Sequence, residues 1–393
     1  MFPVEEFRRD TPGSALRIHF NNAGCSLHPK PIVDAIRQYL EEESYTGGYE
    51  LAAARATELA DFYLAGAAVL NTEPRNIAFV NSATDGYSKA LSSIPFRSGD
   101  VILTTLNDYV SNQIQFIALE KRFGVRIIRS SNTPAGAADP DDLHACIRKY
   151  RPALVSMTHV PNNTGTIQPV EEIGAICVEE GIPYFVDACQ SAGQLPLDVA
   201  RIQCDYLTFS MRKFMRGPRG AGLLYISDRA LETGAMPLLP DMRGADWIEA
   251  NAFRPVQDAK RFEYVEQSNA LILGSALAMR YYLAAGPNAI AERNRALCNY
   301  LRNSLEAISH ITLLDTGSSL SSIISLVSAR TSHPDFRDTL IRNGINCGAA
   351  MKKFALLDFE FKQVDGAVRL SPHYYNTFEE IDKLLQVIRE TGI

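Results

Sequence analysis

Short apolar runs rich in β-branched residues alternate with longer segments of helical period along the first 230 residues. Such an alternation of buried strands and amphipathic helices predicts an α/β fold built on a layered sheet. The seven predicted strands cover residues 76–80, 101–104, 125–128, 153–157, 184–187, 206–209 and 222–226. The predicted helices between them cover residues 85–93, 112–123, 140–150 and 170–180.

The last two predicted strands are joined by a loop that is too short for a helical crossover. Parallel neighbours need a crossover of a dozen residues or more, whereas antiparallel neighbours do not. We therefore expect these two strands to be antiparallel within a mixed, mostly parallel sheet.

The pattern changes beyond residue 230, where an irregular, proline-containing stretch holds the only tryptophan, Trp247. A long helix is predicted from about Ser268, and short strands follow at residues 322–326 and 367–371. This pattern indicates a second, smaller α+β domain. The predicted units are an N-terminal segment packed on the small domain (1–20), a large domain (21–267) and the small domain (268–393).

Charge and composition favour small-molecule chemistry. The 393 residues carry a net charge of -6 without an extended basic run, which argues against a nucleic-acid or anionic-membrane surface. No apolar run is long enough for a membrane span, and the first ten residues do not have the pattern of a signal peptide. The seven cysteines are scattered without a Cys-x-x-Cys pair, so we expect no metal site and a reducing, cytoplasmic location.

Two charged residues indicate a cofactor. Lys213 lies in the loop after one predicted strand, and Asp187 closes the strand before it. A lysine amine forms an imine with the aldehyde of pyridoxal 5'-phosphate (PLP), and a carboxylate keeps its pyridine nitrogen protonated. The pair therefore predicts a PLP enzyme.

Polar residues at other strand ends are candidates for the same site. Thr84 and Asp85 open a helix whose free N–H groups could bind phosphate, although this segment also fits an ordinary helix cap. Tyr109 could stack on the pyridine ring or simply pack. Asn162 could donate to the cofactor or to a substrate carboxylate, or serve the turn. Gln190, three residues after Asp187, could reach the ring.

Several motifs together resemble the class V aminotransferase family of fold-type I PLP enzymes. They lie at residues 20–24, 83–84, 162–165, 187–190, 210–222 and 368–372. The nearest branch contains isopenicillin N epimerase, cysteine C–S lyases and ergothioneine sulfoxide lyases. The resemblance implies a seven-stranded mixed sheet with helices on both faces, a smaller C-terminal domain and a homodimer.

The resemblance also implies roles for individual residues. Lys213 would be the Schiff-base lysine, Asp187 the partner of the pyridine nitrogen, and Gln190 a contact to the phenolate oxygen. The phosphate would be held by Thr84, Ser210 and Arg212, and by the stretch around Ser268 from the partner subunit. Arg369 would bind the substrate carboxylate, helped by Asn162 and the backbone around Asn22.

Two departures from the desulfurases of this family bear on the reaction. Tyr109 and Arg212 stand where those enzymes have histidines, and no cysteine follows Cys347 in the C-terminal domain. We therefore expect β-elimination at a carbon–sulfur bond of an α-amino acid, through a quinonoid. The alternatives are epimerisation, with Tyr109 as a candidate second acid, then transamination. A catalytically silent binding protein on the same fold is the alternative from another class.

Overall fold

The computed structural model describes residues 2–393, and its large sheet has seven strands in the order β2-β8-β7-β6-β5-β3-β4. The strands are β2 (Ile77–Val80), β3 (Val101–Thr105), β4 (Arg126–Ser130), β5 (Leu154–Thr158), β6 (Tyr184–Asp187), β7 (Tyr206–Ser210) and β8 (Gly222–Ile226). Only β8 runs against its neighbours, β2 and β7. The predicted fold class and the antiparallel β7–β8 pair are therefore confirmed.

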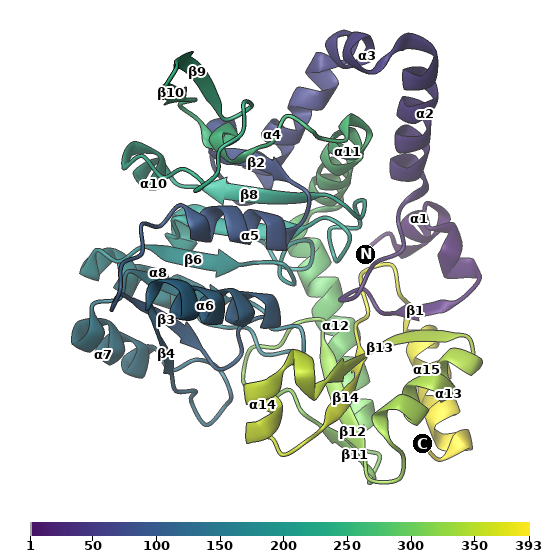
Figure 1. Cartoon of the computed structure of the whole chain (residues 1–393). Helices are drawn as coiled ribbons and strands as arrows, with labels where there is room; N and C mark the ends of the chain where they lie inside the picture. Colours follow the sequence, from purple (N-terminus) through teal and green to yellow (C-terminus); the bar gives the residue numbers. More distant parts are fainter. Residues whose placement is uncertain (1) are drawn as a thin grey trace.

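Helices cover both faces of this sheet because strand residues point alternately to its two sides. In β6, Tyr184 and Val186 join one core cluster, while Phe185 joins the other. The first face is covered by α4 (Ala56–Leu70), α7 (Pro140–Tyr150), α8 (Val170–Glu180) and α11 (Asn269–Ala285). The second is covered by α5 (Ala83–Ser92), α6 (Val110–Phe123) and α10 (Asp228–Glu232). In Figure 1, α5 and α6 lie on the near side of the sheet.

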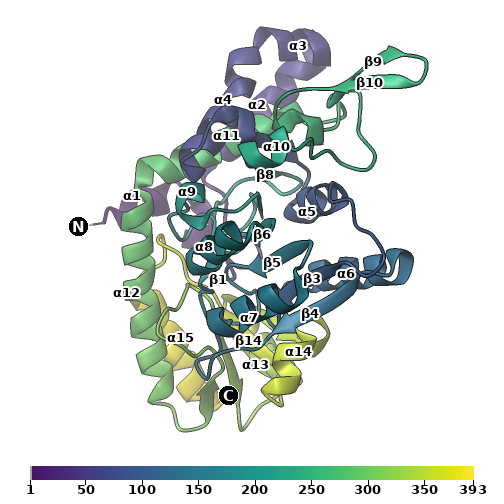
Figure 2. The same cartoon turned by 90° about the vertical axis from the view of Figure 1, so that its left-hand side faces the viewer.

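A second sheet of five strands has the order β1-β13-β14-β12-β11. Its strands are β1 (Ile18–Phe20), β11 (Ile311–Leu313), β12 (Ile324–Ser328), β13 (Ile345–Met351) and β14 (Gly366–Leu370). It is accompanied by α12 (Pro287–Glu306), α13 (His333–Arg342), α14 (Leu356–Phe361) and α15 (Phe378–Thr391). The long helix α12 runs down beside both sheets (Figure 2). The domain boundaries remain a prediction, although β1 pairs with β13 and α11 begins next to Ser268.

Several elements were not predicted from the sequence. They are α1 (Val4–Arg9), α2 (Lys30–Thr46), α3 (Gly48–Ala54), α9 (Val199–Ile202), β9 (Ala245–Glu249), β10 (Ala252–Pro255) and the 3₁₀ turns η1 (Pro12–Ala15), η2 (Pro74–Asn76), η3 (Ala259–Phe262) and η4 (Lys352–Phe354). The α2–α3 pair projects at the top right of Figure 1, and the β9–β10 hairpin projects at the top left. Among residues 2–393, no helix is long and apolar enough to cross a membrane.

The loop that joins β7 to β8, residues 211–221, is held by residues from both ends of the chain. We call it the lysine loop because it contains Lys213. Arg216 in this loop is 1% exposed and donates to the Tyr374 hydroxyl (2.7 Å), to the Leu27 carbonyl (3.1 Å) and to the Thr11 hydroxyl. Its guanidinium lies 4.3 Å from the ring centroid of Tyr375. These acceptors are all neutral, so the guanidinium charge is stabilised by hydrogen bonds and aromatic faces.

Two histidines bond to carbonyl groups of the lysine loop. His28 Nε2 lies 2.9 Å from the Gly217 oxygen, and His373 Nε2 lies 2.8 Å from the Phe214 oxygen. Because a carbonyl only accepts, each ring donates from Nε2. The backbone on either side of Arg216 is therefore tied to the N-terminal segment and to the segment after β14.

Replacing Arg216 by methionine should lower the free energy of unfolding by about 3 kcal/mol, because three acceptors, two of them on buried side chains, lose their donor. Urea denaturation of the purified protein measures this loss. Arg9, which is exposed on α1, provides the control, and Arg9→Met should change stability by less than about 0.5 kcal/mol. Equal stability of the two variants would show that the lysine loop does not depend on Arg216.

Candidate active site

A cavity of about 310 Å³ lies where β5, β6 and β7 end, next to the start of α5. Its size fits a small ligand. Its wall brings together eight of the predicted site residues, Thr84, Tyr109, Asn162, Asp187, Gln190, Ser210, Arg212 and Lys213, with Asn81, Ser82, Ala83, Asn112, Thr158, Val160, Cys189, Arg219, Gly220 and Ala221. The strand ends therefore converge as expected for ligand sites of open α/β sheets.

Asp187 is the buried carboxyl of this cavity. One oxygen accepts from the Cys189 backbone N–H (2.9 Å) and the other from the Asn112 amide (3.2 Å). Burial raises the pKa of Asp187, and the positive charge of Lys213 opposes that rise. A buried carboxyl in this position is suited to bind a cationic N–H group of a ligand.

Lys213 is 7% exposed, and its Nζ lies 5.9 Å from the ring centroid of Tyr109. The backbone after it is held by a close contact with Gly193. Gly193 has φ +91°, and a Cβ there would lie 2.3 Å from the Met215 nitrogen. Only glycine allows the turn after β6 to pack this tightly on the lysine loop.

The start of α5 forms a cup at the other side of the cavity. The Ser82 hydroxyl accepts from the Asp85 N–H (3.1 Å), and the Ser210 hydroxyl accepts from the Ala83 N–H (3.0 Å). Gly222 lets this turn approach, since a Cβ there would lie 2.9 Å from the Ser82 carbonyl carbon. Thr84 lies on the cavity wall.

The side chain of Asp85 is engaged elsewhere. It accepts from the Asn81 N–H (3.0 Å) and pairs with Lys89 (3.2 Å), and it does not line the cavity. Asp85 therefore contributes to the cup as the third residue of α5 rather than through its carboxylate.

Arg369 lies on β14 beside the cavity. It is 8% exposed and donates from Nη1 to the Asn162 carbonyl (2.8 Å), while its Nε has no partner among residues 2–393. Burial and the neighbouring charge of Arg212 lower the pKa of Arg369 to about 10. The guanidinium is therefore charged at neutral pH and can still donate to a carboxylate.

Two further predicted residues, Asn22 and Ser268, also lie outside the cavity wall. Asn22 is fully buried, donating to the Ser371 carbonyl (2.8 Å) and accepting from the Tyr375 hydroxyl (2.6 Å). Its side chain thus ties the N-terminal loop to the end of β14. Ser268 is exposed at the start of α11 and is absent from the cavity wall.

Sequence reasoning missed the residues beneath Tyr109. Asp108 accepts from the Thr104 hydroxyl (2.8 Å), the Thr158 hydroxyl (2.6 Å), the Asn112 amide (2.9 Å) and the Tyr109 N–H (2.7 Å). Asn112 bonds both Asp108 and Asp187, so this network fixes Tyr109 and the buried carboxyl together. The available signal was an acid next to Tyr109 at the end of a strand, with an asparagine four residues later.

The residues present fit PLP. A lysine amine, a buried carboxyl and a helix N-terminus surround one cavity. They match the aldehyde, the pyridine nitrogen and the phosphate of that cofactor, respectively. Two buried polar atoms, Oε1 of Gln190 and Nε of Arg369, have no partner among the described residues. Such atoms need a ligand or water to complete their hydrogen bonds.

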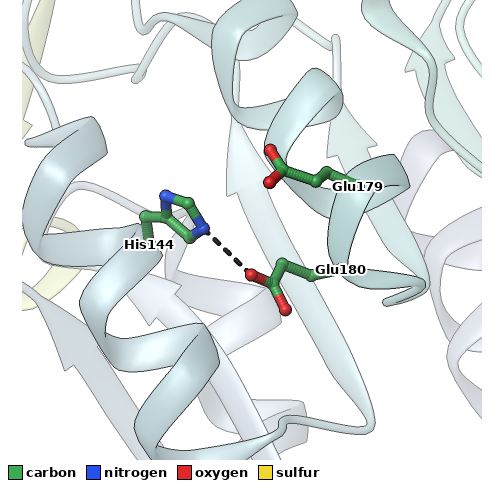
Figure 3. Close-up of side chains that lie close together, drawn as sticks. All are labelled: His144, Glu179 and Glu180. Carbon is green, nitrogen blue, oxygen red and sulfur yellow. Dashed lines mark hydrogen bonds and ion pairs between the residues drawn. The ribbon is translucent and has the colours of Figure 1, made fainter.

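One other group of side chains has the composition of a metal site. His144 on α7 faces Glu179 and Glu180 at the end of α8 (Figure 3). However, Glu180 bonds Arg148 (2.9 Å), His144 (3.1 Å) and Arg151 (2.6 Å), and these partners lower its pKa to about 2. The cluster is therefore an ion-pair network that joins the two helices.

Comparisons with known proteins agree with this geometry. A sequence model of the family described as "Aminotransferase class-V" matches residues 18–384. The chain belongs to the class V aminotransferase family. Since this family uses PLP, the predicted cofactor and the prediction of a PLP-dependent enzyme are confirmed.

Individual relatives span nearly the whole chain. A protein named "Probable cysteine desulfurase" from Pyrococcus abyssi is 27% identical and covers 98% of this chain and 97% of its own length. A cysteine desulfurase from Escherichia coli is 26% identical, and the match covers 98% of this chain and 97% of that protein.

Solved structures show the same fold. The apo structure of a cysteine desulfurase from Thermococcus onnurineus NA1 has a TM-score of 0.91 at 26% identity, covering 100% of this chain and 99% of that chain. A cystine C–S lyase bound to cysteine persulfide has a TM-score of 0.86 at 23% identity, and the match covers 96% of this chain and 98% of that chain.

Acid should destabilise the folded protein through His159, which follows β5. Burial lowers the pKa of this imidazole from 6.5 to about 4, and its Nδ1 has no partner among residues 2–393. Between these two values the unfolded chain binds a proton that the folded chain does not, so stability falls as the pH falls. At pH 5 the loss is about 2 kcal/mol.

Urea denaturation at pH 7 and pH 5 measures this effect. His159→Gln removes the titrating group and should reduce the loss of stability between the two pH values by about 2 kcal/mol. Each protein serves as its own reference at pH 7, which separates the effect from packing. The same loss in both proteins would contradict the assignment.

Proposed function

We propose that this protein is a PLP-dependent carbon–sulfur lyase that cleaves the Cβ–S bond of a cysteine-type amino acid by β-elimination. The observation that carries the proposal is the shared cavity of Lys213 and Asp187 beside the incompletely bonded Arg369. Relatives named for cysteine desulfuration and a structural neighbour named for cystine cleavage support a sulfur amino acid as the substrate.

When bound, PLP withdraws electrons from the α-carbon of the substrate. Asp187 would keep the pyridine nitrogen protonated, and Arg369 would hold the substrate carboxylate with two N–H groups. Lys213 would then take the α-proton with Nζ. The thiol leaves from the β-carbon, and water releases pyruvate and ammonia from the remaining carbon skeleton.

The position of Cys347 favours elimination over transfer of sulfur to a protein thiol. Cys347 lies on β13, is 5% exposed and has its Sγ 3.9 Å from the Arg337 carbonyl. Burial raises the pKa of this thiol to about 12, which makes it a poor nucleophile.

The segment after β13 provides no substitute for this thiol. It folds into η4 and α14, contains no cysteine, and is anchored where the Asn163 amide donates to Asp358 (2.6 Å). A mobile nucleophilic thiol is therefore not available from this part of the small domain.

Product analysis tests the proposal. With L-cysteine or L-cystine, the holoenzyme should release pyruvate and ammonia in equal amounts, and Lys213→Ala should abolish the imine absorbance and reduce the rate by about 10³-fold or more. Cys189, which lines the cavity, provides the control, because Cys189→Ala should retain pyruvate formation. Alanine as product, or deuterium uptake at Cα with racemisation and no pyruvate, would contradict elimination.

We also propose that two copies of the chain form a dimer in which each completes the cavity of the other. Large apolar side chains are exposed on the projecting α2–α3 pair and β9–β10 hairpin, including Tyr45 (85%), Tyr49 (90%) and Trp247 (81%). Such a concentration of exposed apolar area is typical of an interface. The exposed position of Ser268 supports its predicted contribution to the partner's phosphate.

Light scattering should give a mass of twice 43.4 kDa for this protein. Trp247→Asp should shift the population to the monomer, since it places a charge in the proposed interface. Phe361, which is 77% exposed on α14, provides the control, and Phe361→Asp should leave the dimer intact. A wild-type protein with the mass of one chain would disprove the dimer.

A further inference from the structure

A second cavity, of about 250 Å³, lies between the large sheet and the segment that follows β13. We call it the α6–α14 cavity. One side is formed by the loop after β3, by the first turns of α6 and by Arg129 on β4, and the other side by η4 and the start of α14. Its wall shares no residue with the wall of the active cavity. The α6–α14 cavity is therefore a separate space, which a cofactor in the active cavity does not fill.

The body of the α6–α14 cavity is apolar. Ile114 and Ile117 line it from α6, and Leu356 lines it from α14. All three side chains are exposed, so a ligand that covers them removes apolar surface from water. The volume is below the roughly 300–1,000 Å³ of sites for drug-sized ligands, and it suits a metabolite with a short hydrocarbon chain.

Asn107, in the loop after β3, adds a buried acceptor to this wall. The residue is 3% exposed, and its Nδ2 donates to the Gly136 carbonyl (3.4 Å). This bond turns the other atom of the amide, Oδ1, into the free one, and Oδ1 has no partner among residues 2–393. A buried oxygen without a donor is unfavourable, so the site calls for a ligand that carries an N–H group.

Arg129 adds a positive charge to the same wall. Its Nε and Nη2 donate to Oε1 of Gln113 (3.1 and 2.7 Å), which is a neutral acceptor. The carboxylates on the wall are bonded to other groups, since Asp108 accepts from its own four donors and Asp358 pairs with Lys362 (2.9 Å). In the part of the chain that the structure describes, Nε2 of Gln113 also lacks a partner. These groups call for an anion that accepts hydrogen bonds.

We propose that the α6–α14 cavity is a second ligand site, which binds a free α-amino acid with an apolar side chain. The ammonium group donates to Oδ1 of Asn107. The carboxylate accepts from Arg129 and from Nε2 of Gln113. The side chain packs between Ile114 and Leu356. Such a ligand completes both partnerless amides and supplies a counter-charge to the guanidinium, and no single charged group does all three.

The two cavities lie back to back, so the test must separate them. Asp108 and Asn163 line the α6–α14 cavity, whereas the adjacent residues Tyr109 and Asn162 line the active cavity. The holoenzyme is therefore first treated with aminooxyacetate, which reacts with the PLP aldehyde and occupies the active cavity. Only binding is then measured, and the outcome does not depend on whether the enzyme cleaves a carbon–sulfur bond.

Calorimetric titration of this blocked holoenzyme with L-leucine tests the proposal. One L-leucine should bind per chain. The related compounds 4-methylpentanoate, which lacks the ammonium, and 3-methylbutylamine, which lacks the carboxylate, should each bind at least about 10-fold more weakly, because each loses charge-assisted hydrogen bonds. Absence of L-leucine binding would overturn the proposal, as would equal binding of either related compound.

Three variants locate the bound amino acid. Arg129→Gln should raise the Kd for L-leucine by about 10-fold or more, since the charge is lost. Ile114→Trp should prevent binding by filling the cavity, and the exposed position of Ile114 protects the fold from the larger side chain. Arg126, which is exposed on β4 and outside the cavity wall, provides the control, and Arg126→Gln should leave the Kd unchanged. Undiminished binding in Arg129→Gln or in Ile114→Trp would place L-leucine elsewhere and overturn the proposal.

Discussion

The geometry of the active site depends on one buried cation, Arg216, three residues after the lysine that defines the site. Burying a guanidinium is costly unless its N–H groups are all bonded, and here the acceptors come from Thr11, Leu27 and Tyr374. None of these acceptors belongs to the large sheet. The final conformation of the lysine loop is therefore stabilised by contacts from both ends of the chain. The N-terminal segment is correspondingly packed on the small domain, where its three-residue strand β1 pairs with β13.

A second constraint is the balance of charge inside the cavity. Asp108, which is not part of the cavity wall, accepts four hydrogen bonds, whereas Asp187 on the wall accepts only two and lies near Lys213. The cations Arg212 and Arg369 lie on the side of the N-terminal loop and β14. The cavity therefore separates the two kinds of charge: the Asp187 carboxyl can bind a cationic ring, and the two arginines can bind anions. Such preorganised charges favour ligand binding without reorganisation of the site.

The sequence predicted the central sheet well, because its strands are apolar on both faces and each is bounded by helical or turn segments. Residues at the strand ends were likewise predictable, since Asp187 and Lys213 had to meet at one edge. What could not be predicted depends on partners that are distant in sequence. The side chain of Asn22 is hydrogen-bonded to Ser371 and Tyr375 instead of facing the cavity. Strand β1, with three residues, is too short to show a strand pattern. The α2–α3 pair and the β9–β10 hairpin were missed because their exposed apolar residues break the usual alternation.

Similarity of fold does not select among the reactions that PLP supports. The cysteine desulfurase from Thermococcus onnurineus shares the architecture with a TM-score of 0.91 at 26% identity, so the fold alone does not distinguish desulfuration from the proposed elimination. In this chain, the segment that follows β13 contains a helix anchored to Asn163, and Cys347 is buried within the strand. Sulfur released from a substrate would therefore meet no reactive thiol from the small domain and would leave with its substituent.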